Sequence, residues 1–458
     1  MMPVTRPPEL LLPAGSLAHM RTAYDFGADA VYAGQPRYAL RARHNEFDFA
    51  HIAQGIQEAH DRGKKFFLTS NLLAHHDRVK TYLNDLDPLV QMRPDGLTLA
   101  DPGLITMVLN KMHSGAWPHI PIHLSVQANT TNHTAVKFWQ KVGVRRIILS
   151  RELSLDEIEA IRNECPDIEI EVLVHGSLCI AYSGRCLLSG YFNRRDAEQG
   201  LTKDAHRSQA IEKEEMRAVP LGQDFDFAKE QQDAENAFAA CGGVRRHPLA
   251  DQVYLLEELE RPGQLMPVME DEHGTYIMNS KDLRAVEHID RLVKMGVDAL
   301  KIEGRTKSLY YVARTAQIYR CAINDAVAGR PFNPEWIAQL ESLAHRGYTS
   351  GFLERRPSHD YQAYERGEAQ AQHSQYVGQV RRVVEGWAEV ELKHALSVGD
   401  TLEMMHPSGN RLIQLNAMRD EQGQALALTL ATAQTMKVWI FVGDQETHAH
   451  GALLAKLQ

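Results

Sequence analysis

The stretch RIILSRELSLDEIEAIRNECPDIEIEVLVHG, residues 146–176, contains one strand–helix–strand unit. Its two short apolar runs, RIILSRE (146–152) and IEVLVHG (170–176), have the length of buried parallel strands. Between them, Ser154 and Glu157 form the Ser-x-x-Glu pattern of a capping box, which predicts that a helix begins there. The unit therefore predicts two parallel strands of one sheet that are joined by a helix.

The same unit recurs along the first 305 residues. Six further apolar runs are each followed by a polar or glycine-bearing residue and a helical stretch: LLLPAG (10–15), AVYAG (30–34), FFLTSN (66–71), GLTLAD (96–101), IHLSVQ (122–127) and ALKIEGR (299–305). An open dinucleotide-binding sheet typically carries a Gly-x-Gly-x-x-Gly loop after its first strand, and LLLPAGS lacks this pattern. Eight units therefore favour an α/β fold with a closed (β/α)8 barrel of the TIM type.

The rest of the chain divides into an insertion, a linker and a second domain. The insertion, about 177–298, separates the seventh strand from the eighth, and its middle is polar and charged. We expect the barrel with this insertion to span 1–353 and a polar linker to span 354–375. Short alternating runs then predict a small antiparallel β-barrel over 376–458. Such a module binds nucleic acid or simply caps the larger domain.

Composition limits the class of protein. No apolar run reaches the roughly 20 residues of a membrane span, and the leucines at 10–12 are too few for a signal peptide. The five cysteines are odd in number and scattered, which favours a reducing cytoplasm over a secreted disulfide framework. A net charge of −9 counts against binding nucleic acid over the whole surface. Basic pairs such as Arg381-Arg382 allow a local patch, with solvated surface as the alternative.

Polar residues at the strand ends are candidates for the site, because a barrel of this type carries its chemistry at the carboxyl ends of its strands. In IHLSVQAN, strand alternation predicts that His123, Ser125, Gln127 and Asn129 share one face, which suits a polar small molecule. The other strand-end candidates are Asn71, Asp101, His175, Lys301, Glu303 and Arg305.

Arginine and lysine candidates suit an anionic ligand. In KIEGR, alternation places Lys301, Glu303 and Arg305 on one face, and the planar fork of an arginine binds carboxylate or phosphate. The alternative is a structural ion network at the barrel mouth. Arg41 and Arg43 follow the second strand, where solvated side chains are the alternative.

A hydrolase is conceivable, because His175 stands near Ser177 and Cys179 and because Asp101 ends another strand. The chain has no Gly-x-Ser-x-Gly elbow and no His-Glu-x-x-His motif, which makes a peptidase an unfavoured interpretation.

Two cysteines lie just after the seventh strand, in HGSLCIAYSGRC (175–186). Thiolates hold soft metals and iron–sulfur clusters, which need three or four ligands. Cys179 and Cys186 supply two, and Cys241 and His206 are candidates for the others. Because no paired Cys-x-x-Cys signature is present, inert thiols remain the alternative.

Several long motifs together carry a family resemblance: LLLPAG, GADAVYAGQPRYALRARHNEF, LTLADPGL, IHLSVQANTTN, ILSRELSLDEI, VHGSLCIAYSGRCLLSGYFNRRDAEQG and LKIEGRTKS. The chain resembles peptidase family U32 over nearly its whole length, and most closely the tRNA-hydroxylating branch of that family. The resemblance implies hydroxylation of the wobble uridine of tRNA to 5-hydroxyuridine, with prephenate rather than oxygen as co-substrate. Collagenase-like peptidase activity is ascribed only to some relatives.

The resemblance also implies an iron–sulfur cluster on four cysteines. Cys179 and Cys186 match the first two, but Thr202 and His206, in GLTKDAHR, occupy the positions of the other two. Three alternatives stay open: a cluster completed by Cys241 and His206, another metal such as zinc, or loss of the cluster.

Roles follow from the resemblance and the strand-end residues together. We expect His175, Glu303 and Asp101 to be catalytic, and Arg305, Lys301 and Arg185 to hold the two carboxylates of prephenate. The expected substrate contacts also include Asn71, Gln127, Asn129, Arg41, Arg43 and, for stacking of a flipped uridine from the anticodon loop, Tyr191. A non-catalytic RNA-binding protein that has lost its cluster is the remaining alternative.

Overall fold

The structure is a computed structural model. It describes residues 6–39, 46–178, 253–257, 265–271, 274–277, 281–305, 307–345, 347–354, 374–429, 436–443 and 449–457. Within 253–277 the description covers the backbone of the strands only.

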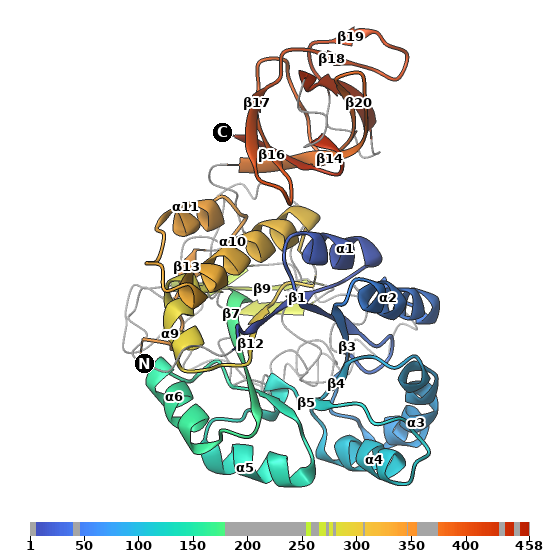
Figure 1. Cartoon of the computed structure of the whole chain (residues 1–458), viewed down its shortest axis with the longest axis vertical. Coiled ribbons are helices and arrows are strands. Elements are labelled where there is room, and N and C mark those ends of the chain that lie inside the picture. The colour runs from blue at the N-terminus through green and yellow to red at the C-terminus, as the bar shows by residue number, and fades with distance from the viewer. Residues whose placement is uncertain are drawn as a thin grey trace.

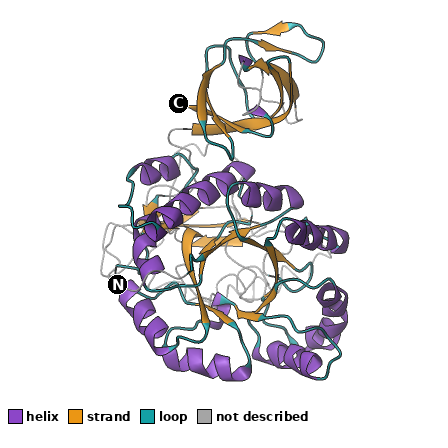
Figure 2. Ribbon diagram, in the orientation of Figure 1, coloured by secondary structure: helices purple, strands orange, loops and turns teal. Residues whose placement is uncertain are grey.

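The larger domain is a closed ring of parallel strands surrounded by helices (Figures 1 and 2). Its strands are β1 (Glu9–Pro13), β2 (Ala30–Gly34), β3 (Lys65–Ser70), β4 (Gly96–Leu99), β5 (Ile122–Leu124), β6 (Arg146–Ile148), β7 (Glu169–Ser177) and β12 (Ala299–Ile302). They pair in this order, and β12 closes the ring because it pairs with both β7 and β1. The predicted (β/α)8 barrel is confirmed, and all eight apolar runs contribute a strand.

Helices connect and cover the strands. They are α1 (Leu17–Asp25), α2 (Phe49–Asp61), α3 (His76–Gln91), α4 (Pro102–His113), α5 (His133–Val142), α6 (Leu155–Glu164), α9 (Ile289–Lys294), α10 (Leu309–Val327) and α11 (Glu335–Glu341), with 3-10 turns η2 (Val126–Ala128) and η3 (Val286–His288). The capping box at the start of α6 is confirmed: the Glu157 N–H donates to Ser154 Oγ over 3.3 Å, and the Ser154 N–H donates to Glu157 Oε2 over 2.8 Å.

Two strands are shorter than strand alternation requires. β5 ends at Leu124, and the chain enters η2, so the expected common face of His123, Ser125, Gln127 and Asn129 is wrong. The strand ends because Ala128 N–H donates to the Ser125 carbonyl, which closes a 3-10 turn. Asn129 then adopts a left-handed conformation with φ of 50°.

β12 likewise ends at Ile302, so Lys301, Glu303 and Arg305 are not alternate residues of one strand. A register shift between Lys301 and Ile302 breaks its pairing with β7, and Gly304 has a φ of 140°. The expected common face of these three side chains is therefore also wrong.

β7 extends beyond the ring. Its last residues pair antiparallel with β11 (Asp282–Arg284), which in turn pairs with β13 (Tyr348–Thr349). Three further strands, β8 (Val253–Glu257), β9 (Leu265–Asp271) and β10 (Gly274–Ile277), form a separate antiparallel sheet. His175 near the end of β7 is thus paired with Ile302 of β12 on one side and with Arg284 of β11 on the other, which fixes its backbone.

The smaller domain is an antiparallel sheet that curls around its own core, at the top of Figure 1. Its strands are β14 (Ser374–Val384), β15 (Trp387–Leu392), β16 (Thr401–Met405), β17 (Arg411–Gln414), β18 (Met418–Arg419), β19 (Ala425–Leu426), β20 (Met436–Phe441) and β21 (Leu453–Leu457). The order is β17-β16-β21-β14-β15-β20-β18-β19, and among the described strands the two end strands do not pair. The predicted small antiparallel barrel is confirmed as a curled half-barrel.

Helix α10 joins the two sheets. Arg314 on this helix forms an ion pair with Glu403 of β16, and both side chains are largely buried. The amides of Gln317 and Asn410 exchange hydrogen bonds of 3.1 and 3.0 Å across the same contact. In the described part of the chain, no helix is both long enough and apolar enough to cross a membrane.

Candidate functional site

The predicted site residues divide by whether the structure describes them. Those outside the described residues are Arg41, Arg43, Cys179, Arg185, Cys186, Tyr191, Thr202, His206 and Cys241. Those described lie in or just beyond the carboxyl halves of the barrel strands: Asn71, Asp101, Gln127, Asn129, His175, Lys301, Glu303 and Arg305.

His175 lies near the end of β7 inside a cage of tyrosine rings. Its ring centroid is 5.7 Å from that of Tyr311, 5.4 Å from that of Tyr319 and 5.4 Å from that of Tyr348. Two of these tyrosines come from α10 and the third from β13. The side chain of His175 is 1% exposed, so the cage excludes water from most of the imidazole.

Hydrogen bonds to Tyr319 determine which nitrogen of His175 carries the proton. The Tyr319 hydroxyl donates to the main-chain carbonyl of Val174 over 2.8 Å, because a carbonyl can only accept. The Tyr319 hydroxyl has no second proton to donate, so His175 Nδ1, which lies 3.2 Å away, must donate to the Tyr319 oxygen. We therefore assign the Nδ1–H tautomer, which leaves a lone pair on Nε2. Nε2 is buried and has no hydrogen-bond partner among the described residues.

The imidazole of His175 is neutral at physiological pH. Burial lowers its pKa to about 3, and the positive charges of Arg284 and Lys307 contribute to the shift. A group with so low a pKa is a weak base at pH 7, so accepting a hydrogen bond from a bound ligand suits Nε2 better than carrying a proton.

A second layer of residues holds the cage in place. His345 stacks on Tyr348 with ring centroids 4.1 Å apart, and the Arg284 guanidinium lies 5.1 Å from the same ring. Glu341 pairs with both, at 2.5 Å from Arg284 and 3.0 Å from His345. The cage tyrosines were not among the site residues predicted from the sequence. Tyr311 and Tyr319 are about two helical turns apart, so the sequence could have predicted that they share one side of a helix. Tyr348 comes close to them only through the pairing of its strand with β11, which the sequence does not reveal.

The chain beyond β12 reaches the same place. The Glu303 N–H donates to the main-chain carbonyl of His175 over 2.8 Å, and the Tyr311 hydroxyl donates to the Glu303 carbonyl over 2.8 Å. Gly176 has a φ of 110°, and a Cβ atom there would lie 2.6 Å from the Glu303 carbonyl oxygen. The backbones that carry two of the expected catalytic residues, His175 and Glu303, are therefore in direct contact.

Asn71 and Gln127 meet at the ends of β3 and β5. Asn71 Nδ2 donates to Gln127 Oε1 over 3.0 Å and approaches Ser125 Oγ at 3.3 Å. Ser125 Oγ also donates to Gln127 Oε1. Asn129 lies beside β6, where its Oδ1 accepts from Ser150 Oγ over 2.9 Å. Asn71, Gln127 and Asn129, three of the expected substrate contacts, therefore lie on neighbouring loops. They do so through the loops themselves and not through the predicted strand alternation.

Asp101 caps α4. Its Oδ1 accepts from the N–H groups of Gly103 and Leu104, and its Oδ2 accepts from the N–H of Ala74 over 3.1 Å. Both carboxylate oxygens therefore hold backbone at the start of a helix. This geometry supports a structural role for Asp101 and gives no support to the expected catalytic one.

Lys301 points into the barrel, where its Nζ lies 2.9 Å from Glu171 and 4.3 Å from the Tyr32 ring centroid. It belongs to a connected ion network with a buried centre, Glu9, Arg146, Glu171 and Lys301, and a more exposed rim, Lys65, Arg145 and Glu169. Burial raises the pKa of Glu9, but Arg146 and Lys65 outweigh it, and the net pKa is lowered. For Lys301, the structural ion network that stood as the alternative interpretation is present.

The Arg305 guanidinium lies beyond this network, 6.0 Å from the Tyr32 ring centroid. Because β12 ends at Ile302, Arg305 lies on the loop side of the barrel, where the family resemblance expects an anionic co-substrate.

The donor set for a metal cluster does not fit four thiolates. Two of the four positions implied by the resemblance hold Thr202 and His206, and Thr is a poor ligand for iron. Among the described residues, no group of three or more His, Cys, Asp or Glu side chains could hold a metal ion. The described cysteines are Cys165 at the end of α6 and Cys321 on α10. We therefore route no chemical step through a cluster.

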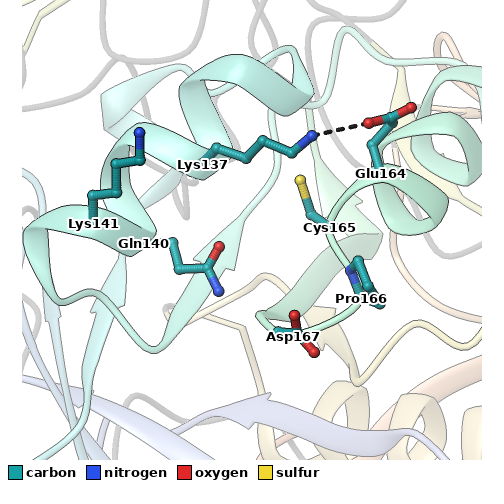
Figure 3. A pocket seen from close by; sticks show the side chains of 7 residues that line it. All are labelled: Lys137, Gln140, Lys141, Glu164, Cys165, Pro166 and Asp167. Atoms are coloured by element: carbon teal, nitrogen blue, oxygen red, sulfur yellow. Dashed lines mark hydrogen bonds and ion pairs between the residues drawn. The ribbon is translucent and has the colours of Figure 1, made fainter.

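A pocket between α5 and α6 is separate from this site (Figure 3). Lys137 and Lys141 of α5 line it together with Glu164 and Cys165, and Lys137 forms a 2.9 Å ion pair with Glu164. The pocket lies at the carboxyl end of α6, which faces the amino ends of the strands. Because chemistry in such barrels lies at the opposite end, we assign no functional role to it.

Comparisons with known proteins agree with the fold. The family model described as Peptidase family U32 matches residues 15–363, and that described as Peptidase family U32 C-terminal domain matches residues 372–454. The tRNA hydroxylation protein P of Escherichia coli is 51% identical over 98% of this chain and 96% of its own length. The protein of the same name from Haemophilus influenzae is 49% identical over 92% and 91%. The tRNA hydroxylation protein P1 of Bacillus subtilis is 32% identical over 95% and 92%. The chain therefore belongs to peptidase family U32.

Proposed function

We propose that this protein is a tRNA-modifying enzyme that hydroxylates the wobble uridine to 5-hydroxyuridine, with prephenate rather than oxygen as co-substrate. The observation that carries the proposal is the 51% identity to the E. coli tRNA hydroxylation protein P, which extends over 98% of this chain. Identity at that level across both domains favours the same class of reaction on the same class of substrate.

In this proposal His175 Nε2 orients the bound substrate. Its buried lone pair accepts a hydrogen bond from an N–H or O–H group of the ligand, and the tyrosine cage excludes water around it. Asn71 and Gln127 supply further hydrogen bonds from the loops after β3 and β5. The uridine has to leave the anticodon stack to reach these groups, as enzymes that act on a base require.

Arg305 is the better of the two described candidates for a prephenate carboxylate. Lys301 already has a carboxylate partner in the fully buried Glu171, so recruiting it would break a buried ion pair and leave Arg146, at 3.3 Å, as the remaining cation beside Glu171. Arg305 lies on the loop side of the barrel, and a guanidinium binds a carboxylate through two parallel hydrogen bonds. We propose Arg185 as the partner of Arg305 for the second carboxylate.

A peptidase is not favoured by any contact of His175. In a Ser-His-Asp arrangement, a carboxylate accepts from Nδ1 and a nucleophile approaches Nε2; in a Cys-His-Asn arrangement the nucleophile and the amide contact the opposite nitrogens. Here Nδ1 donates to a tyrosine, and Nε2 has no partner among the described residues.

Complementation tests the proposal. The chain is expressed in a strain that lacks every other 5-hydroxyuridine-forming enzyme, and its tRNA is digested to nucleosides and weighed by mass spectrometry. We expect 5-hydroxyuridine-derived nucleosides to return, including under anaerobic growth. Their absence, with the protein expressed and folded, would overturn the proposal and leave a non-catalytic RNA-binding protein.

Two assays with purified protein separate the co-substrate from the cofactor. Omitting prephenate should abolish product formation on a tRNA transcript, and admitting oxygen should not restore it. Metal analysis after anaerobic purification distinguishes iron with visible absorption, zinc, and neither, which are the three alternatives for the cofactor.

A further inference from the structure

The outer face of the smaller sheet carries alternating aromatic and cationic side chains from four neighbouring strands. Arg382 comes from β14, Trp387 from β15, Trp439 from β20 and Arg419 from β18. Phe441, on β20, pairs directly with Trp387 in the ladder. We call these five residues the Trp–Arg face.

The five side chains form a continuous row of cation–π and edge-to-face contacts. The Arg382 guanidinium lies 5.0 Å from the Trp439 ring centroid, and the Arg419 guanidinium lies 5.6 Å from the same ring. Arg419 also lies 4.1 Å from the Trp387 ring, whose centroid is 5.4 Å from that of Phe441. Each guanidinium is therefore within cation–π range of an indole, and the order runs Arg382, Trp439, Arg419, Trp387, Phe441.

This face lies outside the core of the sheet: Arg382 and Phe441 are exposed, and Trp387, Arg419 and Trp439 are half-buried. The residues that alternate with it, among them Ala388, Val438 and Ile440, are 0% exposed and form the interior. Phe441 is 43% exposed, and the Arg382 side chain is 63% exposed. Cross-strand aromatic and cation–π pairs stabilise the sheet by about 1 kcal/mol each, and aromatic side chains gathered on the solvent side of a sheet also mark interaction sites.

The face is positively charged, although the chain as a whole carries −9. Glu389, next to Trp387 on the same side of β15, pairs with Arg382 and, at 3.5 Å, with Lys437. No carboxylate in the described part of the chain forms an ion pair with Arg419, whose guanidinium is held between the two indoles. Glu391, two residues further along β15 and opposite Lys437, pairs with Arg381 and Lys393. Five cations against two carboxylates leave a local excess of positive charge, which complements a phosphate backbone.

We propose that the Trp–Arg face binds unpaired nucleotides of the tRNA substrate. Bases stack on the exposed ring of Phe441 and on the accessible parts of the half-buried indoles, while Arg382, Arg419 and Lys437 contact the phosphates. Indole and guanidinium planes interleaved on a positive surface are the combination that binds single-stranded RNA without reading its sequence. The inference rests on the proposed function for the identity of the RNA, and it assigns to the smaller domain the task of holding that RNA.

Binding measurements test the proposal on the full chain. The probes are an unmodified tRNA transcript and a short oligouridylate, and affinity is measured by fluorescence anisotropy over a series of salt concentrations. Trp439→Ala and Arg419→Ala should each weaken binding between about 5-fold and about 100-fold. Arg419→Ala should also reduce the slope of the salt dependence by about 0.7 for each phosphate that the variant no longer neutralises. Arg419→Lys, which keeps the charge but loses the planar stack, should recover only part of the affinity.

A matched control and a second signal separate stacking from misfolding. Phe138→Ala with Arg330→Ala removes one exposed aromatic and one exposed arginine from the barrel, at 57% and 58% exposure, and should leave affinity unchanged. Bound bases should quench the tryptophan fluorescence of the wild type. Trp387→Phe with Trp439→Phe should lose this quenching while it keeps measurable affinity and an unchanged melting temperature.

Wild-type affinity in the Trp439→Ala and Arg419→Ala variants would overturn the assignment of this face. That outcome leaves the proposed function intact if the same preparations still hydroxylate tRNA. Conversely, a wild type that binds RNA through this face but forms no 5-hydroxyuridine would overturn the proposed function alone.

Discussion

At the scale of single residues, His175 shows what a linear motif reveals and what it omits. A histidine at the end of a buried strand, in a barrel that carries its chemistry there, is a candidate site residue from the sequence alone. Its protonation state was not predictable, because it depends on Tyr319, which is 144 residues away in the chain. The same holds for Asp101 and Lys301: their residue types suggest chemistry, whereas their partners, backbone amides and Glu171, give them structural roles.

Two substitutions separate the nitrogens of His175. In His175→Asn the amide can still donate to Tyr319, as Nδ1 does, but no acceptor remains at the position of Nε2. We expect a loss of turnover of about 10-fold in the tRNA hydroxylation assay, the effect of one lost hydrogen bond, and a loss of stability of about 1 kcal/mol or more from the missing ring. His175→Gln, whose oxygen reaches toward the position of Nε2, should retain more activity. Equal activity of His175→Asn and the wild type would contradict the role given to Nε2.

Acid should destabilise the folded protein through its buried histidines. Burial lowers the pKa of His175 to about 3 and that of His123, which faces Arg146 and Lys301, well below its ordinary value. In the unfolded chain both titrate near 6.5, so only the unfolded state takes up protons as the pH falls below that value. The stability from keeping each one neutral is complete above pH 6.5 and falls by about 2 kcal/mol by pH 5.

Urea unfolding between pH 7 and pH 5 measures this effect. The His175→Gln variant should lose stability less steeply than the wild type, by close to one proton of uptake over this range. Identical slopes would show that His175 titrates normally in the folded protein.

At the scale of elements, the positions of strands were predictable and their ends were not. Apolar runs located all eight barrel strands, because a strand buried on both faces has a distinctive composition. The ends of β5 and β12 depend on hydrogen bonds from elsewhere. Ser125 N–H donates to the Leu99 carbonyl before the 3-10 turn, and Glu303 N–H donates to the His175 carbonyl after the register shift. Strand alternation depends only on neighbouring residues in the sequence, so it cannot predict either of these two backbone hydrogen bonds.

The junction of β7 and β12 should be intolerant of a side chain at Gly176. An alanine there combines a φ of 110° with a Cβ atom 2.6 Å from the Glu303 carbonyl oxygen, which is backbone and cannot move alone. We expect Gly176→Ala to cost about 3 kcal/mol in the free energy of unfolding, measured with urea. Gly63→Ala is the matched control, because its φ is 64° and no atom lies within 4 Å of the new Cβ. It should cost about 1 kcal/mol.

At the scale of the whole molecule, α10 connects the two parts that the proposals assign to chemistry and to RNA. One side of the helix presents Tyr311 and Tyr319 to His175, and another presents Arg314 to Glu403 of the smaller sheet. The barrel core also includes Met405 and Leu453 from that sheet. The sequence predicted both domains but not this contact, because nothing in the pattern of either one identifies the helix on which the second sheet rests.

Breaking the Arg314–Glu403 pair should therefore affect both domains. Arg314 is 1% exposed, so Arg314→Ala leaves the Glu403 carboxylate without its cation at a buried contact. We expect a loss of about 3 kcal/mol or more in the free energy of unfolding, measured with urea. Replacing both partners, Arg314→Met with Glu403→Leu, should restore most of the loss because no charge is left buried. Arg330→Ala, at an exposed pair with Asp325, should change stability by less than about 1 kcal/mol.

If α10 couples the domains, Arg314→Ala should also split a single unfolding transition into two, with the smaller sheet melting first. A single transition at wild-type stability would show that the Arg314–Glu403 pair contributes nothing to the coupling.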